Sequence, residues 1–544
     1  MKKYLFPTIS IFCIIIGFLI GNAMSHKAEA QQIDWARLLQ PRSKVDQLLQ
    51  MMNSSYVDPI DVDSITEEVM EVLVEKLDPH SAYIPKEDLE MVNSELSASF
   101  SGIGVQFNIQ NDTVYIVAVI PGGPSEAVGL LAGDKIVLVD DSVFSGKGIN
   151  NEKVLHTLRG PKDTQVKLSI KRAGTAELLH YVITRGEIPV HSVDASFLMQ
   201  EHIGYIKVNK FSETTYEEFM AALAKLKASG AQSYIVDLRE NSGGYMDQTI
   251  KMANEFLHAG QLIVYSEGRA YPRFEAKANG LGRFKDVPLV VLINEFSASA
   301  SEIFAGAMQD NDRATIIGRR SFGKGLVQQQ IPFNDGSAVR LTIARYYTPS
   351  GRCIQKPYTL GDQMDYEKDL LERFEHGEFY SADSIHMQDT TKYYTAGGRI
   401  VYGGGGILPD IFVGRDTTLY TPFYNKCVNL AYTYQFAFKY TNDHRKQLQK
   451  FTDWQELEKY LLKANVLKDF LKYADSKGVN AQDSTLYLYS DLSFNEQVKK
   501  STPLINHLIC AYIVRNILDE NAFYAIFERD DEITKRAIKE LEKN

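Results

Sequence analysis

A serine and a lysine, each in a short segment of small residues, are the side chains best suited to covalent chemistry. Ser299 lies in Phe296-Ser297-Ala298-Ser299-Ala300, between an apolar run that predicts a buried strand (287–293) and a stretch that predicts a helix (302–309). A serine at such a turn from strand to helix is exposed in the manner of a nucleophile. Lys324 lies between two glycines, and a desolvated lysine amine is a base that can take the serine proton.

Both residues also fit patterns that need no catalysis. Ser299 and Glu302 have the S-x-x-E spacing of a capping box, in which the serine only begins a helix. Residues 318–325 have the glycine and lysine spacing of a phosphate-binding P-loop. Gly325 stands where a P-loop has the Ser or Thr that binds magnesium, and the residues after it predict a short strand where a P-loop needs a helix. The sequence therefore disfavours nucleotide binding at this segment.

The length and composition of the chain predict several packed domains. Its 544 residues are 44% apolar and 24% charged, which is enough for roughly three or four hydrophobic cores. The formal net charge of −10 argues against a broad nucleic-acid surface, so no nucleic-acid partner is expected. Charges of both signs are interleaved and indicate no other partner.

The first 30 residues predict export from the cytoplasm. Lys2 and Lys3 precede an apolar run, 4–20, and Ala28-Glu29-Ala30 offers a small-x-small cleavage site. The apolar run is close to the shortest length that spans a bilayer. Residues 1–30 are therefore either a cleaved signal peptide, which is the favoured alternative, or an uncleaved membrane anchor. In both cases the body of the protein is expected in the periplasm or elsewhere outside the cytoplasm.

The cysteines exclude a disulfide framework. Cys13 lies in the export segment, which leaves Cys353, Cys427 and Cys510. These three have no metal-ligand spacing, and at most one disulfide can form among them.

Two regions of different character follow the export segment. Residues 31–97 have apolar side chains at helical spacing and end their second helix before Pro79. Packing, or an arm for dimerisation, is the favoured role for this helical N-terminal segment. Residues 98–190 instead contain short β-type runs and glycine turns, beginning with Gly102-Ile103-Gly104-Val105. Consecutive backbone N–H groups in such a glycine loop can converge on an anion.

The region 98–190 resembles a PDZ domain over nearly all of its length. Residues 127–136 match the short helix of that family and the turn after it. The family's carboxylate-binding loop is matched by Gly102, Ile103, Gly104 and Val105. The resemblance implies that the terminal carboxylate of a substrate binds at this loop while its last residues extend the adjacent sheet edge. A β-domain with glycine turns and no ligand is the alternative.

The longest region, 191–414, alternates strand and helix patterns and predicts an α/β core. A buried strand, 234–238, leads into a turn that ends in Gly243-Gly244. Glycine N–H groups at the carboxyl end of a strand can stabilise a developing oxyanion, although a Gly-Gly pair is usually only a turn. Within the core, the charged and tyrosine-rich residues 356–395 predict an insertion or a flexible surface segment. Residues 415–544 predict a helical tail that packs or dimerises.

Several stretches of the core together resemble the carboxyl-terminal processing peptidases, also called tail-specific proteases, which use a Ser/Lys dyad. The order of helical segment, PDZ domain and protease core is also that of the family, and the resemblance covers about residues 40–414. It implies a core of repeated ββα units with the fold of crotonase and Clp-type peptidases. The expected fold is thus multidomain α/β, with helical N- and C-terminal segments. The matching stretches are 237–244, 296–310, 321–329, 346–354 and 406–413.

The resemblance also assigns roles within the site. Ser299 matches the nucleophile of the family and Lys324 matches its general base. The remaining matches are Gln328, which orients the lysine, and the oxyanion-hole N–H groups of Ala300 and of Gly243 or Gly244.

The activity implied by this resemblance is that of an exported serine endopeptidase. Its substrates would be proteins with free, apolar C-terminal tails, recognised through the PDZ domain, and it would need no metal or cofactor. Three alternatives stay open: a PDZ-based binding module without catalysis, a nucleotide hydrolase built on 318–324, and a Ser/His/Asp enzyme. His258 and the other histidines show no motif context for the last of these. A homodimer and a membrane anchor through the N-terminal segment also stay open.

Overall fold

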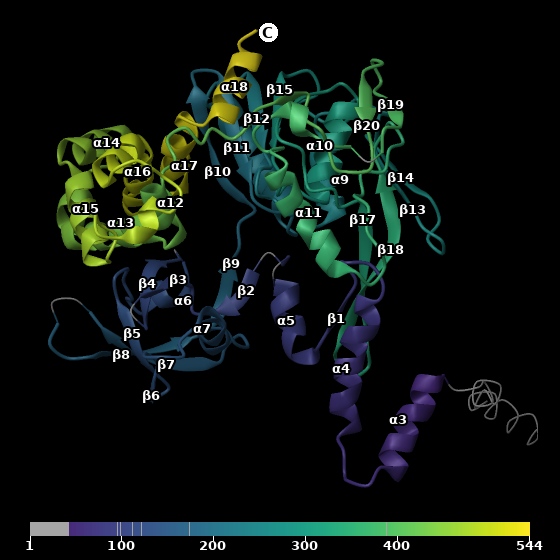
Figure 1. Ribbon diagram of the computed structural model, residues 1–544, viewed down its shortest axis with the longest axis horizontal. Helices are drawn as coiled ribbons and strands as arrows, with labels where there is room; N and C mark the ends of the chain where they lie inside the picture. The colour runs from purple at the N-terminus through teal and green to yellow at the C-terminus, as the bar shows by residue number, and fades with distance from the viewer. Residues whose placement is uncertain are drawn as a thin grey trace, which may run out of the picture. The chain divides into compact units, whose positions relative to one another are not determined.

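Figure 1 shows the ribbon of the computed structural model, which describes residues 43–543 except 95, 98, 111, 121, 173, 174 and 388. The predicted export segment, 1–30, lies outside the described residues. The described part falls into two units, of which the first ends at Leu73. This first unit contains α3 (Lys44–Ser55), which begins with a capping box at Ser43, and most of α4 (Val62–Glu75).

The second unit begins with a strand that joins the core. After α4, β1 (Ala82–Ile84) pairs antiparallel with β18 (Ala338–Tyr347), and α5 (Lys86–Ser94) follows. Asp78 fixes the turn before β1, because its carboxylate accepts hydrogen bonds from two backbone N–H groups of the turn at 3.0 and 3.1 Å. A segment predicted only to pack or to dimerise therefore supplies a strand to the core.

The region that resembles a PDZ domain has a six-stranded antiparallel sheet of its own. The sheet order is β3-β4-β5-β7-β8, with β6 paired to β5, while β2 and β9 form a separate pair. Its hydrophobic core draws all its buried members from residues 103–183. The elements are β2 (Ser99–Gly102), β3 (Val105–Gln110), β4 (Thr113–Val119), α6 (Pro124–Ala127), β5 (Lys135–Val139), β6 (Ser142–Val143), α7 (Asn151–Leu158), β7 (Gln165–Lys171), β8 (Leu179–Thr184) and β9 (Gly186–Pro189).

A second six-stranded sheet, of order β10-β11-β12-β15-β16-β21, carries the α/β core (Figure 1). Neighbours from β11 onward are parallel, and β10 is antiparallel to β11. Strands buried on both faces are continuous apolar runs, which is why the sequence predicted β12 and β15. The strands are β10 (Val193–Gln200), β11 (Ile203–Val208), β12 (Ser233–Asp237), β15 (Leu289–Ile293), β16 (Thr315–Gly318) and β21 (Ile411–Phe412).

Helices and a five-stranded antiparallel sheet complete the core. The sheet has the order β1-β18-β13-β14, with β17 also paired to β18. Buried residues of the helices α8, α9 and α10 join one face of the parallel sheet in the largest hydrophobic cluster. These elements are α8 (Thr215–Ala228), α9 (Met246–Asn254), β13 (Leu262–Glu267), β14 (Phe274–Lys277), α10 (Ala300–Asp310) and β17 (Leu326–Pro332).

The charged segment 356–395 is anchored to the core. Arg373 of α11 is buried, and its guanidinium donates hydrogen bonds to the backbone oxygens of Arg320 and Ser321 at 2.8 and 3.1 Å. This segment therefore supports the loop that precedes Lys324. Its elements, with the strand that follows, are α11 (Gln363–Glu375), η1 (Ala382–Ser384), β19 (Lys392–Tyr394) and β20 (Ile400–Tyr402).

The tail is helical, as predicted, and most of it surrounds a separate hydrophobic core. No helix among the described residues is long and apolar enough to cross a bilayer. Cys353, Cys427 and Cys510 are free thiols, so the one disulfide that the sequence allowed is not formed among them. The tail elements are α12 (Pro422–Asn429), α13 (Tyr432–Leu448), α14 (Trp454–Lys463), α15 (Val466–Ser476), η2 (Ser484–Tyr487), α16 (Phe494–Ile517), α17 (Glu520–Arg529) and α18 (Glu532–Leu541).

Candidate active site

One cavity of about 520 Å³ is lined by all the residues of the α/β core that were predicted to act in catalysis or in the oxyanion hole. Arg340 and Tyr346 of β18 line it as well. Residues 102–105 do not line this cavity. The predicted residues that the fold brings together there are Gly243, Gly244, Ser299, Ala300, Lys324 and Gln328.

Ser299 has a strained backbone at the start of α10. Its φ and ψ are 54° and −112°, a conformation that few residues other than glycine adopt. The strain places the serine at the turn between β15 and α10, as its sequence context predicted. Gly243 packs against it so closely that a Cβ at Gly243 would lie 2.8 Å from the Ser299 Cβ. A glycine is therefore required at position 243.

Glu302 connects the serine segment to the lysine segment. Its buried carboxylate accepts hydrogen bonds from the N–H groups of Ser299 (2.8 Å), Gly323 (2.7 Å) and Lys324 (2.9 Å), and from the Ser321 hydroxyl (2.6 Å). Burial raises the pKa of Glu302, while these hydrogen bonds favour its ionised form. The capping-box residue seen in the sequence is thus also the group that holds the two segments together.

The Lys324 amine is held by a neutral partner. Its Nζ donates a hydrogen bond to Oε1 of Gln328 at 3.1 Å, and the Gln328 amide in turn donates to the backbone oxygen of His80. Among the described residues Lys324 forms no ion pair. Burial lowers the pKa of Lys324, and the nearby positive charge of Arg340 lowers it further. Both effects favour the neutral amine, which is the form that can accept a proton.

A buried tyrosine hydroxyl also bridges the two segments. The Tyr346 hydroxyl lies 3.0 Å from the backbone oxygen of Ser299 and also donates to that of Lys324. Because Tyr346 is fixed in β18, it sets the position of both backbones relative to the five-stranded sheet.

The glycine turn lies beside Ser299, but its first N–H group is already engaged. Gly243 donates its N–H to the side-chain oxygen of Asn241 at 2.9 Å, and the Asn241 amide donates to the backbone oxygen of Val208. Ala300 is the first residue of α10, a position whose N–H has no partner within the helix. In this conformation Gly244 and Ala300 are better placed than Gly243 to offer free N–H groups.

The phosphate-binding alternative does not fit the lysine segment. The N–H groups of Gly323 and Lys324 point at Glu302, and that of Gly325 donates to the Gln355 side chain at 2.7 Å. Strand β17 follows the segment, as predicted, where a P-loop needs a helix. A phosphate would have to displace a buried carboxylate to reach these N–H groups.

Sequence reasoning missed three residues of the site. Glu302 and Tyr346 lie in two of the stretches that carry the resemblance, but only a helix-cap role was visible for Glu302 and none for Tyr346, and no local signal pointed to His80. His80 lies near the lysine: burial, with the charge of Lys324, lowers the pKa of His80 to about 4. Its Nε2 is 2.9 Å from the Tyr366 hydroxyl, and the lowered pKa keeps the ring neutral at physiological pH.

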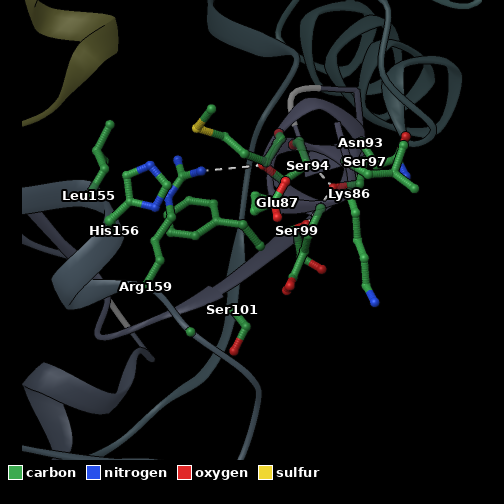
Figure 2. A pocket seen from close by; sticks show the side chains of 15 residues that line it. Lys86, Glu87, Asn93, Ser94, Ser97, Ser99, Ser101, Leu155, His156 and Arg159 are labelled. Carbon is green, nitrogen blue, oxygen red and sulfur yellow. Dashed lines mark hydrogen bonds between the residues drawn. The ribbon is translucent and has the colours of Figure 1, made fainter. Parts of the chain in front are cut away.

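The predicted carboxylate-binding loop, residues 102–105, belongs to the PDZ-like region and is far from Ser299 in the sequence. Ile103 is buried in that core, and Gly104 has a φ of 75° with no room for a Cβ beside Ile188. A separate cavity of about 580 Å³ adjoins the loop and is lined by α5, by Ser97, by residues 99–101 and by the end of α7. Figure 2 shows Arg159 in this cavity, with its hydrogen bond to Ser94.

Three family models match this chain. Peptidase family S41 matches residues 202–367 and the PDZ domain matches residues 101–181. A family of unknown function matches residues 423–519. The S41 range contains Ser299 and Lys324, and the PDZ range contains the predicted carboxylate loop.

Two known proteases show how much of the chain is shared. A carboxy-terminal-processing protease of Bartonella bacilliformis is 35% identical over 362 residues, which are 65% of this chain and 80% of that protein. The carboxy-terminal processing protease CtpA of Bacillus subtilis is 36% identical over 330 residues, 60% of this chain and 70% of that protein.

Two solved structures are similar to parts of this chain. The photosystem II D1 C-terminal processing protease is 27% identical, covers 57% of this chain and 83% of its own, and has a TM-score of 0.34. The PDZ domain of a carboxy-terminal protease from Vibrio cholerae, in complex with a peptide, is 28% identical, covers 17% of this chain and 99% of its own, and has a TM-score of 0.16. From its identity to the Bartonella protease over four fifths of that protein, the chain belongs to the carboxy-terminal processing proteases, serine-type peptidases of family S41 with a PDZ domain.

Proposed function

We propose that this peptidase cleaves exported proteins with a Ser299/Lys324 dyad and selects them by their free, apolar C-termini. The observation that carries the dyad is the environment of the lysine. Its amine is half-buried, donates to the amide of Gln328 and has no carboxylate partner among the described residues. A lysine in such surroundings loses its proton below its ordinary pKa and becomes a general base.

The mechanism begins when neutral Lys324 takes the proton of the Ser299 hydroxyl. The serine oxygen attacks the carbonyl carbon of the scissile peptide, and the N–H groups of Ala300 and Gly244 stabilise the resulting oxyanion. Each such donor lowers the barrier by about 3 kcal/mol. Gly243 can serve as a donor only after it releases Asn241.

The intermediate then collapses with loss of the amine. The C–N bond breaks, protonated Lys324 gives its proton to the leaving nitrogen, and an acyl-enzyme remains on Ser299. Water attacks the ester while Lys324 accepts one of its protons. The C–O bond to Ser299 then breaks, Lys324 returns the proton to the serine oxygen, and the acid product leaves. Gln328 holds the amine in place between these steps through its hydrogen bond to Nζ.

The experiment is cleavage of an unfolded reporter that ends in an apolar residue, with either a free carboxylate or an amide at the end. Wild type should cleave the free-acid reporter faster, and Ser299→Ala and Lys324→Ala should each abolish cleavage. Circular dichroism and thermal melting of each variant show whether the fold survives. Substantial activity in folded Lys324→Ala would exclude the dyad, and equal rates on the two reporters would exclude recognition of the carboxylate.

The PDZ loop is the proposed site of this carboxylate. Successive N–H groups of a glycine loop such as residues 102–105 can bind an anion, and β3, at the edge of its sheet, suits an extended peptide. Membership in a family of processing proteases favours this enzyme over a PDZ binding module that lacks catalysis.

Export is proposed from the first 30 residues of the sequence. N-terminal sequencing of the protein from fractionated cells tests it, because a cleaved signal peptide leaves Gln31 as the first residue. A protein that begins at Met1 in the cytoplasmic fraction would exclude export.

A further inference from the structure

The last two helices of the tail lie outside the matched family models, yet α18 packs into the protease core and α17 lies against its edge strand β10. Side chains of α18 pack with strands β11, β12, β15 and β16 in one cluster, on the face of the parallel sheet opposite α8 to α10. Figure 1 shows α17 and α18 beside this sheet. The α18 members of the cluster are Ile533, Ala537 and Leu541.

An arginine at the end of β12 ties these helices to the sheet. The Arg239 guanidinium donates to Asp237 at 2.5 Å, to Glu528 of α17 at 2.5 Å and to Asp531, which caps α18, at 2.8 Å. The Thr534 hydroxyl donates to the same Glu528 oxygen at 2.7 Å. Arg239, Asp237 and Glu528 are all buried.

The tail also adds two carboxylates to this buried network. Within the core, Arg239 pairs with Asp237, and the Lys207 amine lies 3.3 Å from the same carboxylate. Glu528 and Asp531 are the further partners of Arg239. Loss of one partner from a buried ion-pair network is strongly unfavourable, so the tail helps to hold Arg239 in this position.

Arg239 begins the turn that carries the glycines of the active site. Its backbone N–H donates to Asp237 at 2.9 Å, and its backbone oxygen accepts from Lys207 at 2.5 Å. The next residue, Glu240, has a φ of 59°, which few residues other than glycine adopt. Any movement of the Arg239 backbone therefore passes directly into the turn that leads to Gly243 and Gly244.

We propose that Glu528 is a positioning residue for the oxyanion turn: through Arg239, the tail fixes the turn that carries the Gly244 N–H group. The proposal rests on the proposed function of Gly244 and Ala300 as oxyanion donors. It assigns the segment after residue 519 a part in catalysis without contact with the substrate.

The test compares Glu528→Gln with a matched control in the full-length protein. Glu458→Gln removes a buried carboxylate of the same tail, one that pairs with Arg529 at 2.7 Å and touches no residue of the active site. Asp531→Asn is the milder variant, because asparagine still caps α18 and only the negative charge that faces Arg239 is lost. Glu528→Asp keeps the charge and should restore part of the activity.

The main measurement is the affinity for a peptide boronate, which forms a tetrahedral adduct with the serine. The dissociation constant of the boronate does not depend on what fraction of the enzyme is folded. For kcat, the concentration of active enzyme is obtained by labelling the active sites with a fluorophosphonate. We expect Glu528→Gln to lower kcat and boronate affinity about tenfold with KM nearly unchanged, and Asp531→Asn to lower them about threefold. The pH dependence that reports Lys324 should not move.

Two outcomes would overturn the proposal. One is that Glu528→Gln lowers boronate affinity no more than Glu458→Gln does. If Glu528→Gln does not fold, Asp531→Asn takes its place in this comparison. The other is that KM rises in proportion to the loss of kcat/KM, which indicates lost substrate binding. If wild type and Ser299→Ala cleave the reporter equally, the proposed dyad fails, and that result is independent of the comparison among the tail variants.

Discussion

At the scale of single residues, the site depends on groups that neither attack nor take a proton. Glu302 receives three backbone N–H groups, and Tyr346 lies against two backbone oxygens of the same two segments. These contacts hold Ser299 in a strained conformation, and such strain persists only where the surroundings fix it. The reactive geometry is therefore a property of Glu302 and Tyr346 as much as of the dyad.

Replacing Glu302 by glutamine should remove most of the activity. An amide has one acceptor oxygen where the carboxylate has two, and its NH2 group would face backbone N–H donors. We expect a loss of about 2–4 kcal/mol in folding stability and a fall in kcat of at least about tenfold. Thermal melting and reporter cleavage measure the two effects. The control is Glu255→Gln, a buried glutamate that accepts from Tyr216 and the Arg283 N–H outside the cavity; equal loss of kcat there would contradict the special role of Glu302.

The pH dependence of kcat/KM should report the lysine. Because the neutral amine is the active form and burial lowers its pKa, activity should rise with pH, with a midpoint below the ordinary lysine value of 10.5. Arg340→Gln removes a positive charge that lowers the pKa of Lys324, so the rise should move to higher pH. Arg345→Gln, an exposed arginine of the same strand, should leave it in place. A shift to lower pH in Arg340→Gln would be opposite to the expected electrostatic effect.

At the scale of elements, the edge strand β1 connects the N-terminal segment to the base. Asp78 accepts from the hydroxyls of Ser81 (2.6 Å) and of Thr342 in β18 (2.9 Å), so the turn is fixed to the sheet. The same turn presents the backbone oxygen of His80 to Gln328, the partner of Lys324. The base is therefore oriented by a segment far from it in the sequence.

Replacing Asp78 by asparagine should lower both stability and activity. Burial raises the pKa of Asp78, but hydrogen bonds from Ser81, Thr342 and the turn lower it more, so the net pKa lies below 3.8. The stability from this ionised group is present above pH 3.8 and is lost as pH falls through the lower, folded-state pKa.

Thermal melting between pH 7 and pH 3 checks this expectation. Asp78→Asn should melt lower at pH 7, by the equivalent of about 1–3 kcal/mol, and its melting temperature should depend less on pH in the acid range. Asp383→Asn, in an exposed turn, is the control. A variant with unchanged melting and unchanged kcat would show that the turn does not orient Gln328.

At the scale of the whole molecule, hydrophobic cores decide which regions are independent. The PDZ core draws its buried members from residues 103–183 alone, and the helical tail has a core of its own between residues 423 and 526. The parallel sheet is different, because one of its faces is covered by α18 from the end of the chain. The protease core is therefore complete only when the chain has been made to its last helix.

Two fragments should consequently behave in opposite ways. Residues 99–189 alone should fold cooperatively, because their core is self-contained, whereas a protein that ends at residue 519 should expose the sheet face beneath α18 and aggregate. Circular dichroism with thermal melting, and light scattering, distinguish the two results. A monomeric, active protein that ends at residue 519 would contradict the structural role of α17 and α18.

The sequence predicted the parts of this fold that have local signals. Strands 234–238 and 287–293 were predicted because continuous apolar runs mark strands buried on both faces, and Ser299 and Lys324 stood in short, distinctive segments. The contacts of Tyr346 and His80 could not be predicted, because His80 and Gln328 are 248 residues apart and pair only after the sheet forms. The sequence predicted a tail that packs or dimerises, but it did not show that α18, which is rich in charged residues, packs on the parallel sheet. The domain boundaries 31–97, 98–190, 191–414 and 415–544 stay predictions.

The carboxylate of Glu302 has a consequence for how the site opens. The amide protons of Ser299, Gly323 and Lys324 come from two segments but end on this one buried group. Each amide proton can exchange with deuterium only when its hydrogen bond to the Glu302 carboxylate breaks. The three protons should therefore exchange at one common, slow rate. Ser299 and Lys324 would then be displaced in one cooperative step. The resting enzyme would populate only two states, one with both residues in place and one with both displaced.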